Sequence, residues 1–450
     1  MIDFSKFNIK DDFFTQNHPN YDYNTFHRIC EIILLETSSR NARELWQLNK
    51  LNNLIKYVHD KSVFWKERIP TPHFQSLEEL KNLPIQTREN VRTQVSLEGC
   101  LLNNLIKDYE LQHTSGSSGV PIKFYKDRSK IWECLCRDFS RLVLSNLDLS
   151  DNFTKLFSIS NIPSPGFQVM SEGHEFMNGM CYTGHRRVIP YSNPDLEEFI
   201  KAISSEKIGN LCVNPYMMDT LRQKYSIEEM KKDGMNVWIP IGGSASQEAR
   251  EDCNRANVRI VCNYSSEEIG MIGYECNKCE EHYHVFGTNV IVECDYEEDM
   301  SIKNEKVGRL LITKLDSYAT PFIRYDIGDV GELLHKCPCG HDGQTIRNLH
   351  GRRKNLVKKL DGSIWPFLIQ IKNHKFMADY KEYRFIQTKI DTIRIQIGGI
   401  SSLSEEEANK WANVVYDQLG KDNINIEIEL LDEIDWGEST KKIPFKSLVI

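Results

Sequence analysis

HTSGSSGVPIKFY, running from His113 to Tyr125, is the most distinctive local pattern in this chain of 450 residues. Glycines let a backbone approach a polyphosphate closely, hydroxyl and amide groups donate hydrogen bonds to phosphate oxygens, and a lysine neutralises their charge. The residues that would act in this way are Thr114, Ser115, Gly116, Ser117, Ser118, Gly119 and Lys123. No Gly-Lys-Ser/Thr follows, so the pattern differs from the Walker loop. A turn rich in serine and glycine is often only a flexible loop, so its meaning depends on the rest of the chain.

The segments around this loop predict an α/β protein with more than one domain. Residues 23–105 carry apolar positions at three- and four-residue spacing, which predicts helices. Between 154 and 264, short strand-like runs alternate with helical ones, which is typical of a parallel sheet covered by helices. Residues 285–334 are typical of antiparallel strands. We therefore expect a large N-terminal domain, residues 1–350, with α/β layers and a β-subdomain, and a small α+β domain at 351–450.

Composition excludes several classes of protein. Acidic residues outnumber basic ones by 64 to 56, and the net charge of −8 argues against a nucleic-acid partner. With 40% hydrophobic and 27% charged residues, the chain has the balance of a globular protein. No apolar run approaches the length of a membrane span, and the first residues lack the apolar core of a signal peptide. We expect a cytoplasmic protein without a membrane partner.

Four later segments add polar chemistry to the loop at His113. They are a glycine turn in IPIGGSAS (239–246), a tyrosine beside paired carboxylates in CNYSSEEIG (262–270), two aspartates in PFIRYDIGDVGEL (321–333), and the basic GRRKNLVKKLDGSIW (351–365). Each of these segments alone has a plain structural interpretation, as a turn, a core residue or a basic linker. The order of all five motifs is much more specific than any one of them.

In this order, the five motifs resemble those of the adenylate-forming superfamily, which includes acyl-CoA synthetases and the adenylation domains of peptide synthetases. The chain is most similar to the phenylacetate–CoA ligase-like branch, over almost its whole length. The resemblance implies that ATP and Mg²⁺ activate a small carboxylic acid, aromatic in this branch, as an acyl-adenylate. The acyl group would then pass to a thiol, with coenzyme A as the expected acceptor. A mobile C-terminal domain would close over the intermediate.

The resemblance also implies roles for individual residues. Thr114 to Gly119 and Lys123 would form the phosphate loop, and residues 351–355 would form the hinge of the C-terminal domain. The other residues implied in nucleotide binding are Gly242, Gly243 and Ser244 at the adenine, Asn263, Tyr264 packed on the adenine, Asp329 at the ribose, and Arg352 nearby. Glu268 would hold Mg²⁺, although Glu267 stands where the family usually has a hydroxyl. The late catalytic lysine matches Lys442 best, with Lys441 and Lys446 as alternatives because the usual preceding glycine is absent.

Two close cysteine pairs predict a structural zinc site. The chain has 13 cysteines, an odd number scattered along its length, which is unlike a secreted disulfide framework. Cys276 and Cys279 form one pair, and Cys337 and Cys339 form the other, at spacings that suit tetrahedral zinc. The related branch offers His284 as an alternative ligand. With four protein ligands the metal would have no open position for catalysis; a reduced pair of thiols without metal is the plain alternative.

Other questions stay open from the sequence. The acid pocket is expected to include residues 157–180 and the turn at 242–245. A carrier protein or an amine could replace coenzyme A as the acceptor, and a non-catalytic nucleotide-binding homologue is the alternative from a different class. The sequence also leaves open whether the chain is a monomer or a homodimer.

Overall fold

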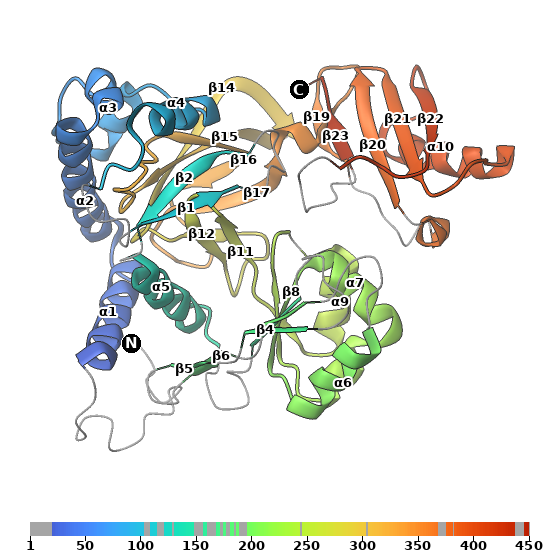
Figure 1. Ribbon diagram of the computed structural model, residues 1–450, viewed down its shortest axis with the longest axis horizontal. Helices are drawn as coiled ribbons and strands as arrows, with labels where there is room; N and C mark the ends of the chain where they lie inside the picture. Colours follow the sequence, from blue (N-terminus) through green and yellow to red (C-terminus); the bar gives the residue numbers. More distant parts are fainter. Residues whose placement is uncertain are drawn as a thin grey trace.

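The structure of the chain is a computed structural model. The described residues are 20–102, 109–114, 121–127, 130–147, 156–159, 168–171, 174–176, 181–183, 186–188, 196–243, 245–302, 305–367, 375–380, 382–436 and 445–449. Figure 1 shows a part in which helices flank an antiparallel sheet, an α/β part, and a C-terminal part at the other end. The mixed α/β fold class expected from the sequence is confirmed.

The chain before the first strand is helical, as the apolar spacing predicts. The helices are α1 (Asn20–Glu36), α2 (Arg40–Lys61), α3 (Val63–Arg68), the 3-10 turn η2 (Leu77–Asn82) and α4 (Arg88–Glu98). Hydroxyl side chains start three of them: Ser39, Ser62 and Thr87 accept hydrogen bonds from free N–H groups in the first turns of α2, α3 and α4. None of the helices within the described ranges is long and apolar enough to cross a bilayer.

A seven-stranded antiparallel sheet lies beside these helices (Figure 1). Its order is β11-β12-β13-β17-β16-β15-β14. The strands are β11 (Asn263–Ser266), β12 (Gly270–Glu275), β13 (Tyr283–Val285), β14 (Val290–Ile302), β15 (Glu305–Lys314), β16 (Tyr325–Leu334) and β17 (Thr345–Arg352). A separate antiparallel pair, β1 (Tyr109–His113) and β2 (Lys123–Asp127), lies beside the sheet, and Phe124 of β2 packs into the sheet's apolar core.

The α/β part contains a six-stranded sheet of order β10-β9-β8-β3-β7-β4, in which β4 alone runs antiparallel to its neighbour. The strands are β3 (Leu156–Ile159), β4 (Gln168–Ser171), β7 (Arg186–Val188), β8 (Asn210–Val213), β9 (Val237–Pro240) and β10 (Arg259–Ile260), and β5 (His174–Phe176) pairs with β6 (Cys181–Thr183) nearby. The associated helices are α5 (Lys130–Leu144), α6 (Leu196–Glu206), α7 (Pro215–Lys224), α8 (Ile227–Lys232) and α9 (Gln247–Arg255). Every residue of β8 and β9 is buried, as expected for parallel strands covered on both faces.

The C-terminal part has its own core. Strands β20 (Glu382–Lys389), β21 (Thr392–Gly398), β22 (Asn425–Leu431) and β23 (Phe445–Ser447) form a sheet of order β22-β21-β20-β23, against which α10 (Glu405–Leu419) packs. Trp411 of α10 is fully buried among the aromatic side chains of this core. The part has the α+β character that the sequence predicts.

The connection to the C-terminal part begins within the antiparallel sheet. Strand β17 runs to Arg352, so the domain boundary expected after residue 350 falls inside this strand. The 3-10 turn η4 (Arg353–Asn355) follows, then the hairpin of β18 (Leu356–Lys358) and β19 (Ile364–Pro366). Leu356 and Ile364 pack against Val307 and Val330 of the sheet. The hairpin is therefore anchored to the antiparallel sheet by apolar contacts, and a second short turn, η6 (Lys375–Asp379), precedes β20.

Candidate functional site

Three of the residues singled out in the sequence meet in the antiparallel sheet. Asp329 in β16 lies directly opposite Arg352 in β17. The Nε atom of Arg352 is 3.2 Å from Oδ1 of Asp329, and the hydroxyl of Tyr264 donates a hydrogen bond of 2.8 Å to Oδ2. All three side chains are largely or fully buried. Residues far apart in the sequence thus form one buried polar cluster.

The contact from Tyr264 requires the sheet to curl. Strands β12, β13 and β17 lie between β11 and β16 in hydrogen-bonded order. In a flat sheet, four steps of about 4.8 Å would place the two strands roughly 19 Å apart, much farther than a tyrosine side chain reaches. The hydrogen bond from Tyr264 to Asp329 therefore shows that β11 curls back over the strands that carry Asp329 and Arg352.

Gly328 makes room for the guanidinium group of Arg352. Its φ of +84° is a left-handed conformation, and a Cβ atom there would stand 3.2 Å from Nη1 of Arg352. The same Nη1 atom donates a hydrogen bond to the carbonyl of Ile327. A side chain at position 328 would strain the backbone and crowd the arginine, so the glycine in the motif has a structural cause.

Burial and neighbouring charges shift the pKa values of the three groups in the cluster. Burial raises the pKa of Asp329 above its ordinary value of 3.8, although Arg352 and the hydrogen bond from Tyr264 act in the opposite direction. Burial alone would lower the pKa of Arg352, but the charge of Asp329, followed by that of Glu268, raises it on balance. Burial and the neighbouring Asp329 also raise the pKa of Tyr264, so its hydroxyl stays protonated and able to donate.

Glu268 faces the same region, whereas Glu267 does not. Glu268 is 3% exposed, and its Oε1 atom accepts a hydrogen bond of 3.1 Å from the hydroxyl of Tyr325 at the start of β16. Glu267 is exposed. Of the two carboxylates that the sequence offers, Glu268 is the one that the fold brings to the cluster. Burial and the charge of Glu268 raise the pKa of Tyr325, which stays a donor.

The structure describes only the two ends of the serine–glycine loop. Thr114 is buried, and its hydroxyl accepts hydrogen bonds from the N–H of Ile122 (3.1 Å) and from Nη2 of Arg88 (2.9 Å). Residues 115–120, which include the predicted serines and glycines, lie outside the described residues. Lys123 is exposed on β2, opposite His113 of β1.

Arg88 is a functional candidate that the sequence did not reveal. It is the first residue of α4, immediately after the capping Thr87, and its Nε atom is buried with no hydrogen-bond partner among the residues that the structure describes. Its charge also acts on Tyr325. No motif surrounds Arg88, and the only signal is a basic residue at the start of a capped helix.

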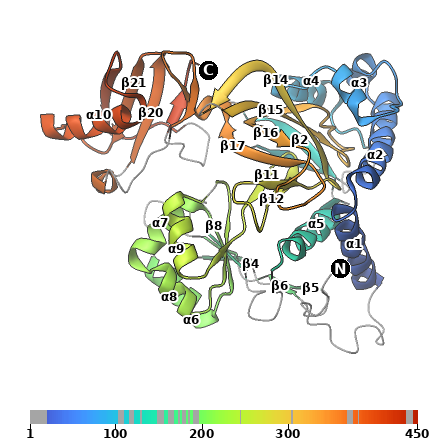
Figure 2. The same cartoon turned by 180° about the vertical axis from the view of Figure 1, so that it is seen from behind.

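The glycine turn and Asn263 lie where the α/β part joins the antiparallel sheet. Gly242 (φ +76°) and Gly243 follow β9, and Ser244 lies outside the described residues. Only two residues separate the end of β10 from Asn263, the first residue of β11, so the chain passes directly between the two parts (Figures 1 and 2). Within the described part of the chain, the Oδ1 atom of Asn263 is buried without a hydrogen-bond partner, which leaves a buried acceptor for a ligand.

The structure describes only some of the remaining predicted residues. Lys441 and Lys442 lie in the segment 437–444, outside the described residues, while Lys446 is exposed on β23. The expected acid pocket at 157–180 is described only as short strands, without side chains. Gly351 and Arg352 end β17, and the turn η4 contains the rest of the predicted hinge.

Four possible metal ligands converge at the other end of the antiparallel sheet. The donor atoms of Cys276, His284, Cys337 and Cys339 all lie within 4.8 Å of one another. The Nε2 atom of His284 is 3.4 Å from Sγ of Cys339. Cys279 is outside this group of four, although its thiol interacts with those of Cys276 and Cys337. The structure therefore brings three of the four predicted cysteines together with His284, and leaves Cys279 beside them.

The surroundings of this cluster suit metal-bound thiolates. Backbone N–H groups of Lys278 and His341 donate to the sulfur atoms of Cys276 and Cys339, at 3.4 and 3.3 Å. Burial alone would raise the pKa of Cys276, but backbone N–H groups lower it on balance. Burial lowers the pKa of His284 to about 3, so its imidazole is neutral, as a metal ligand must be. A set of three sulfur atoms and one imidazole nitrogen fits Zn²⁺.

Several known proteins are similar to this chain in sequence or in structure. No family model matches the chain. A phenylacetate-coenzyme A ligase of Thermus thermophilus is 20% identical over 350 residues, which are 75% of this chain and 76% of that protein. A crystal structure of 2-hydroxyisobutyryl-CoA ligase with 2-HIB-AMP superposes with a TM-score of 0.64 at 15% identity, over 92% of this chain and 91% of that one. The acyl acid amido synthetase GH3.15 superposes at 0.53, with 12% identity over 88% and 87%. These likenesses confirm the resemblance to the adenylate-forming superfamily.

The buried ion pair leads to a test by mutation and pH. We expect Arg352→Met to lower the free energy of unfolding by about 3 kcal/mol at neutral pH, because it leaves Asp329 charged, buried and without its cation. Without the arginine, the pKa of Asp329 rises further above its value in the unfolded chain. Stability then falls as pH rises between these two values, so the deficit should be smaller near pH 5 than near pH 7.

Urea denaturation of the ligand-free protein at the two pH values measures this effect. Arg352→Lys keeps a positive charge and should recover much of the lost stability. A deficit of the same size at both pH values would show that the charge of Asp329 is not the cause.

Proposed function

We propose that this chain, which has the fold of the adenylate-forming superfamily, is an acid–thiol ligase that activates a carboxylic acid with ATP and passes it to coenzyme A. The observation that carries the proposal is the buried cluster of Tyr264, Asp329 and Arg352 with Glu268 beside it. Such a cluster is costly to bury, and its groups match what a nucleotide offers: hydroxyls, phosphates and an associated cation.

Asp329 would hold the ribose. A carboxylate can accept about four hydrogen bonds, and Tyr264 and Arg352 each engage one of its oxygens. About two acceptor positions remain, which is what the 2′- and 3′-hydroxyls of a ribose need. Tyr264 and Arg352 thus act as positioning residues that fix the orientation of the carboxylate.

Asn263 would recognise the adenine. Its buried Oδ1 atom has no hydrogen-bond partner among the described residues and can accept a hydrogen bond from the exocyclic amino group of the base. The backbone turn at Gly242 and Gly243 would form one wall of the same pocket. Neither glycine carries a Cβ atom, so a flat ring can approach their backbone closely.

The phosphates would lie between the serine–glycine loop, Arg88 and Glu268. Arg88 is anchored on Thr114, the first residue of the loop, so its guanidinium is fixed close to where the loop begins. Glu268 would hold Mg²⁺ with the carboxylate oxygen that Tyr325 does not engage. The metal would supply charge neutralisation on the phosphate oxygens when bound.

The chemistry then requires two displacements. An oxygen of the acid attacks the α-phosphorus of ATP, the bond from this phosphorus to the bridging oxygen breaks, and diphosphate leaves with the electron pair. In the second step the thiolate of coenzyme A attacks the acyl carbon, and AMP leaves. Both steps bring anions together, so the side chains act mainly by orientation and by charge stabilisation. Lys442 is proposed to contact the acid and the α-phosphate, carried there by the C-terminal part.

The similar proteins suggest candidates for the acid and for the acceptor. An aromatic acid is implied by the phenylacetate–CoA ligase-like branch and by the name of the Thermus relative. The likeness to an acyl acid amido synthetase favours a second candidate, in which an amine takes the place of coenzyme A. A carrier protein is a further acceptor with the same first half-reaction.

A screen of carboxylic acids tests the proposed function. We expect purified protein with ATP and Mg²⁺ to form an acyl-adenylate from at least one acid, detected by trapping with hydroxylamine and by mass spectrometry. Glu268→Gln should lower this rate about a hundredfold or more, because it removes a charge that the metal needs. The exposed neighbour provides the matched control: Glu267→Gln should stay close to wild type.

Adding coenzyme A, an amine panel or a carrier protein to the preformed adenylate identifies the acceptor. The absence of any adenylate across a broad acid library would contradict the ligase and favour a nucleotide-binding regulator.

The late lysine allows a separate prediction. Lys442→Ala should slow adenylate formation by about a hundredfold or more while leaving the unfolding temperature unchanged, because the residue would act on charge in the transition state. Lys441→Ala and Lys446→Ala, assayed in parallel, decide the register. Full activity of Lys442→Ala, with loss of activity in one of the other two, would assign the role to that neighbour.

We also propose that Cys276, His284, Cys337 and Cys339 hold a structural zinc ion. The site is remote from the nucleotide cluster: β17 begins at Thr345, near these ligands, and ends seven residues later at Arg352. At about 3.4 Å per residue, the two ends of this strand are roughly 24 Å apart. Four protein ligands would leave no open position, so the metal would stabilise the fold and take no part in the reaction.

The loop that carries Cys337 and Cys339 also contacts the N-terminal helices. Backbone N–H of Arg40 donates to the carboxylate of Asp342 at 3.0 Å, and the guanidinium of Arg43 donates to the carbonyl of Asp342. His341 stacks on His284 with ring centroids 4.2 Å apart. Zinc would therefore fix a loop on which the junction of α1 and α2 rests.

Metal content and stability test the zinc site. We expect about one zinc ion per chain by elemental analysis, lost together with thermal stability in Cys337→Ser and His284→Ala. Cys279→Ser should keep the metal, and Cys100→Ser serves as a control outside the cluster. Loss of zinc in Cys279→Ser with retention in His284→Ala would establish the four-cysteine set instead.

A further inference from the structure

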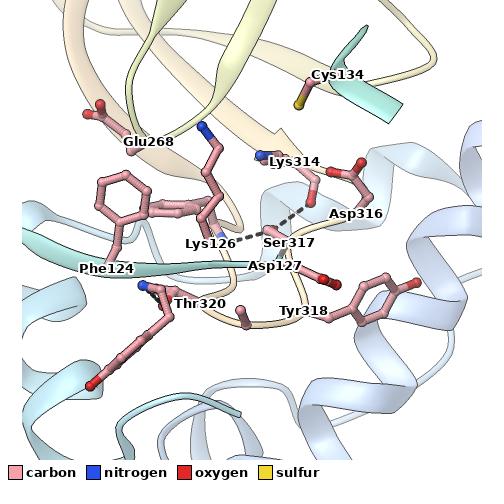
Figure 3. A pocket seen from close by; sticks show the side chains of 13 residues that line it. Phe124, Lys126, Asp127, Cys134, Glu268, Lys314, Asp316, Ser317, Tyr318 and Thr320 are labelled. Atoms are coloured by element: carbon pink, nitrogen blue, oxygen red, sulfur yellow. Dashed lines mark hydrogen bonds between the residues drawn. The ribbon is translucent and has the colours of Figure 1, made fainter. Parts of the chain in front are cut away.

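A narrow pocket lies next to Glu268, on the side of the antiparallel sheet where β2 packs (Figure 3). It is formed by β2, the first part of α5 and the segment that joins β15 to β16, and it is partly open to solvent. The charged residues that line it are Lys126, Asp127, Glu268, Lys314 and Asp316. The sequence motifs assign a role only to Glu268, so the purpose of the other charges is open.

Lys314 is the unusual member of this set. It is the last residue of β15 and is only 7% exposed. In the described part of the chain, its Nζ atom has neither an ion pair nor a hydrogen bond. Burial lowers its pKa, although Asp316 acts in the opposite direction. An ammonium group that is buried without an anionic partner costs free energy, and a bound anion would repay this cost.

The other charges around Lys314 leave the pocket suited to an anion. Figure 3 shows that the side chains of Lys126 and Lys314 enter the same space from β2 and β15, between Glu268 and Asp316. Asp316 is already engaged, because its Oδ2 atom is 2.7 Å from Nη2 of Arg137. Asp127 also lines the pocket, and Figure 3 shows its carboxylate beside Tyr318, away from the ammonium group of Lys126. Two ammonium groups therefore face one space, with the carboxylate of Glu268 at its edge.

We propose that this pocket binds the diphosphate that adenylation releases, with Lys314 and Lys126 as its cationic contacts. The assignment of the ligand rests on the proposed function, in which Glu268 holds Mg²⁺ on the phosphates of ATP. When the bond to the α-phosphorus breaks, the bridging oxygen leaves with the electron pair on diphosphate. The pocket then offers this anion two positive charges directly beside the carboxylate that holds its metal.

The carboxylate of the acid substrate fits this position less well. A free carboxylate would meet Glu268 at the edge of the pocket and be repelled, whereas magnesium diphosphate brings the cation that Glu268 requires. Diphosphate also has oxygens at both ends, so it can contact two lysines from different strands at the same time. The pocket would thus draw the leaving group away from the reaction centre.

Isothermal calorimetry with sodium diphosphate and excess MgCl₂ tests the proposal directly. We expect one binding event in wild type, weakened about tenfold or more in Lys314→Met and in Lys126→Met, because a charge-assisted contact is lost in each. AMP binding, measured on the same samples, should be unchanged in all variants. The exposed Lys66→Met on α3 is the matched control and should bind diphosphate as wild type does.

Thermal unfolding provides a second measurement that does not depend on activity. Lys314→Met should unfold at a higher temperature than wild type without ligand, since it removes an uncompensated buried charge. Diphosphate should raise the unfolding temperature of wild type more than that of the variant. A Lys314→Met protein that is less stable and binds diphosphate normally would show that the lysine is structural and overturn the site.

The two proposals fail in different ways. If the protein forms an adenylate but binds diphosphate independently of the two lysines, the diphosphate site is contradicted and the proposed ligase activity is supported. If diphosphate binding depends on both lysines but no acid gives an adenylate, the pocket is an oxyanion site and the proposed ligase activity is contradicted. Equal weakening of sulfate binding in the same variants would show a general oxyanion pocket and contradict the assignment to diphosphate.

Discussion

The buried ion pair between Arg352 and Asp329 is the interaction on which the candidate site depends. Asp329 is a carboxylate in a place where burial opposes its charge, and Arg352 is the cation that balances it. Arg352 is also the last residue of β17, and the turn that leads to the C-terminal part begins directly after it. The group that orients the proposed ribose contact is therefore joined in sequence to the segment on which the C-terminal part would move. One side chain links the nucleotide site to the proposed hinge.

The same antiparallel sheet would support two different tasks at its two ends. At one end β17 carries Arg352 and faces Asp329, and near its other end the cysteines and His284 converge. A rigid strand between them lets a metal stabilise the loops at one end without entering the chemistry at the other. The curl of the sheet, which brings Tyr264 onto Asp329, depends on this framework being kept in register. Stability and catalysis would thus be separated in space while sharing the same strands.

Much of the fold and part of the site could be predicted from the sequence. Helical spacing, the alternation of strands with helices and the late α+β unit all have local signals, and the structure confirms the fold class that they predict. Tyr264, Glu268, Asp329 and Arg352 stand in recognisable motifs, and the fold brings them together. Arg88 and Lys314 were missed because their positions follow from where a helix begins and where a strand ends, which no short motif records. Tyr325 stands inside the motif at 321–333, but only the fold shows that it contacts Glu268. The resemblance offered His284 as an alternative ligand, and the fold places it among three of the cysteines.

Equilibrium binding of two nucleotides tests the proposed recognition of the ribose by Asp329. AMP and 2′,3′-dideoxy-AMP differ only in the two hydroxyls that the free acceptor positions of Asp329 would hold. We expect wild type to bind AMP at least about tenfold more tightly than the dideoxy compound, and Asp329→Asn to lose most of this preference. Equal affinity of wild type for the two nucleotides, or a preference that Asp329→Asn retains in full, would contradict it.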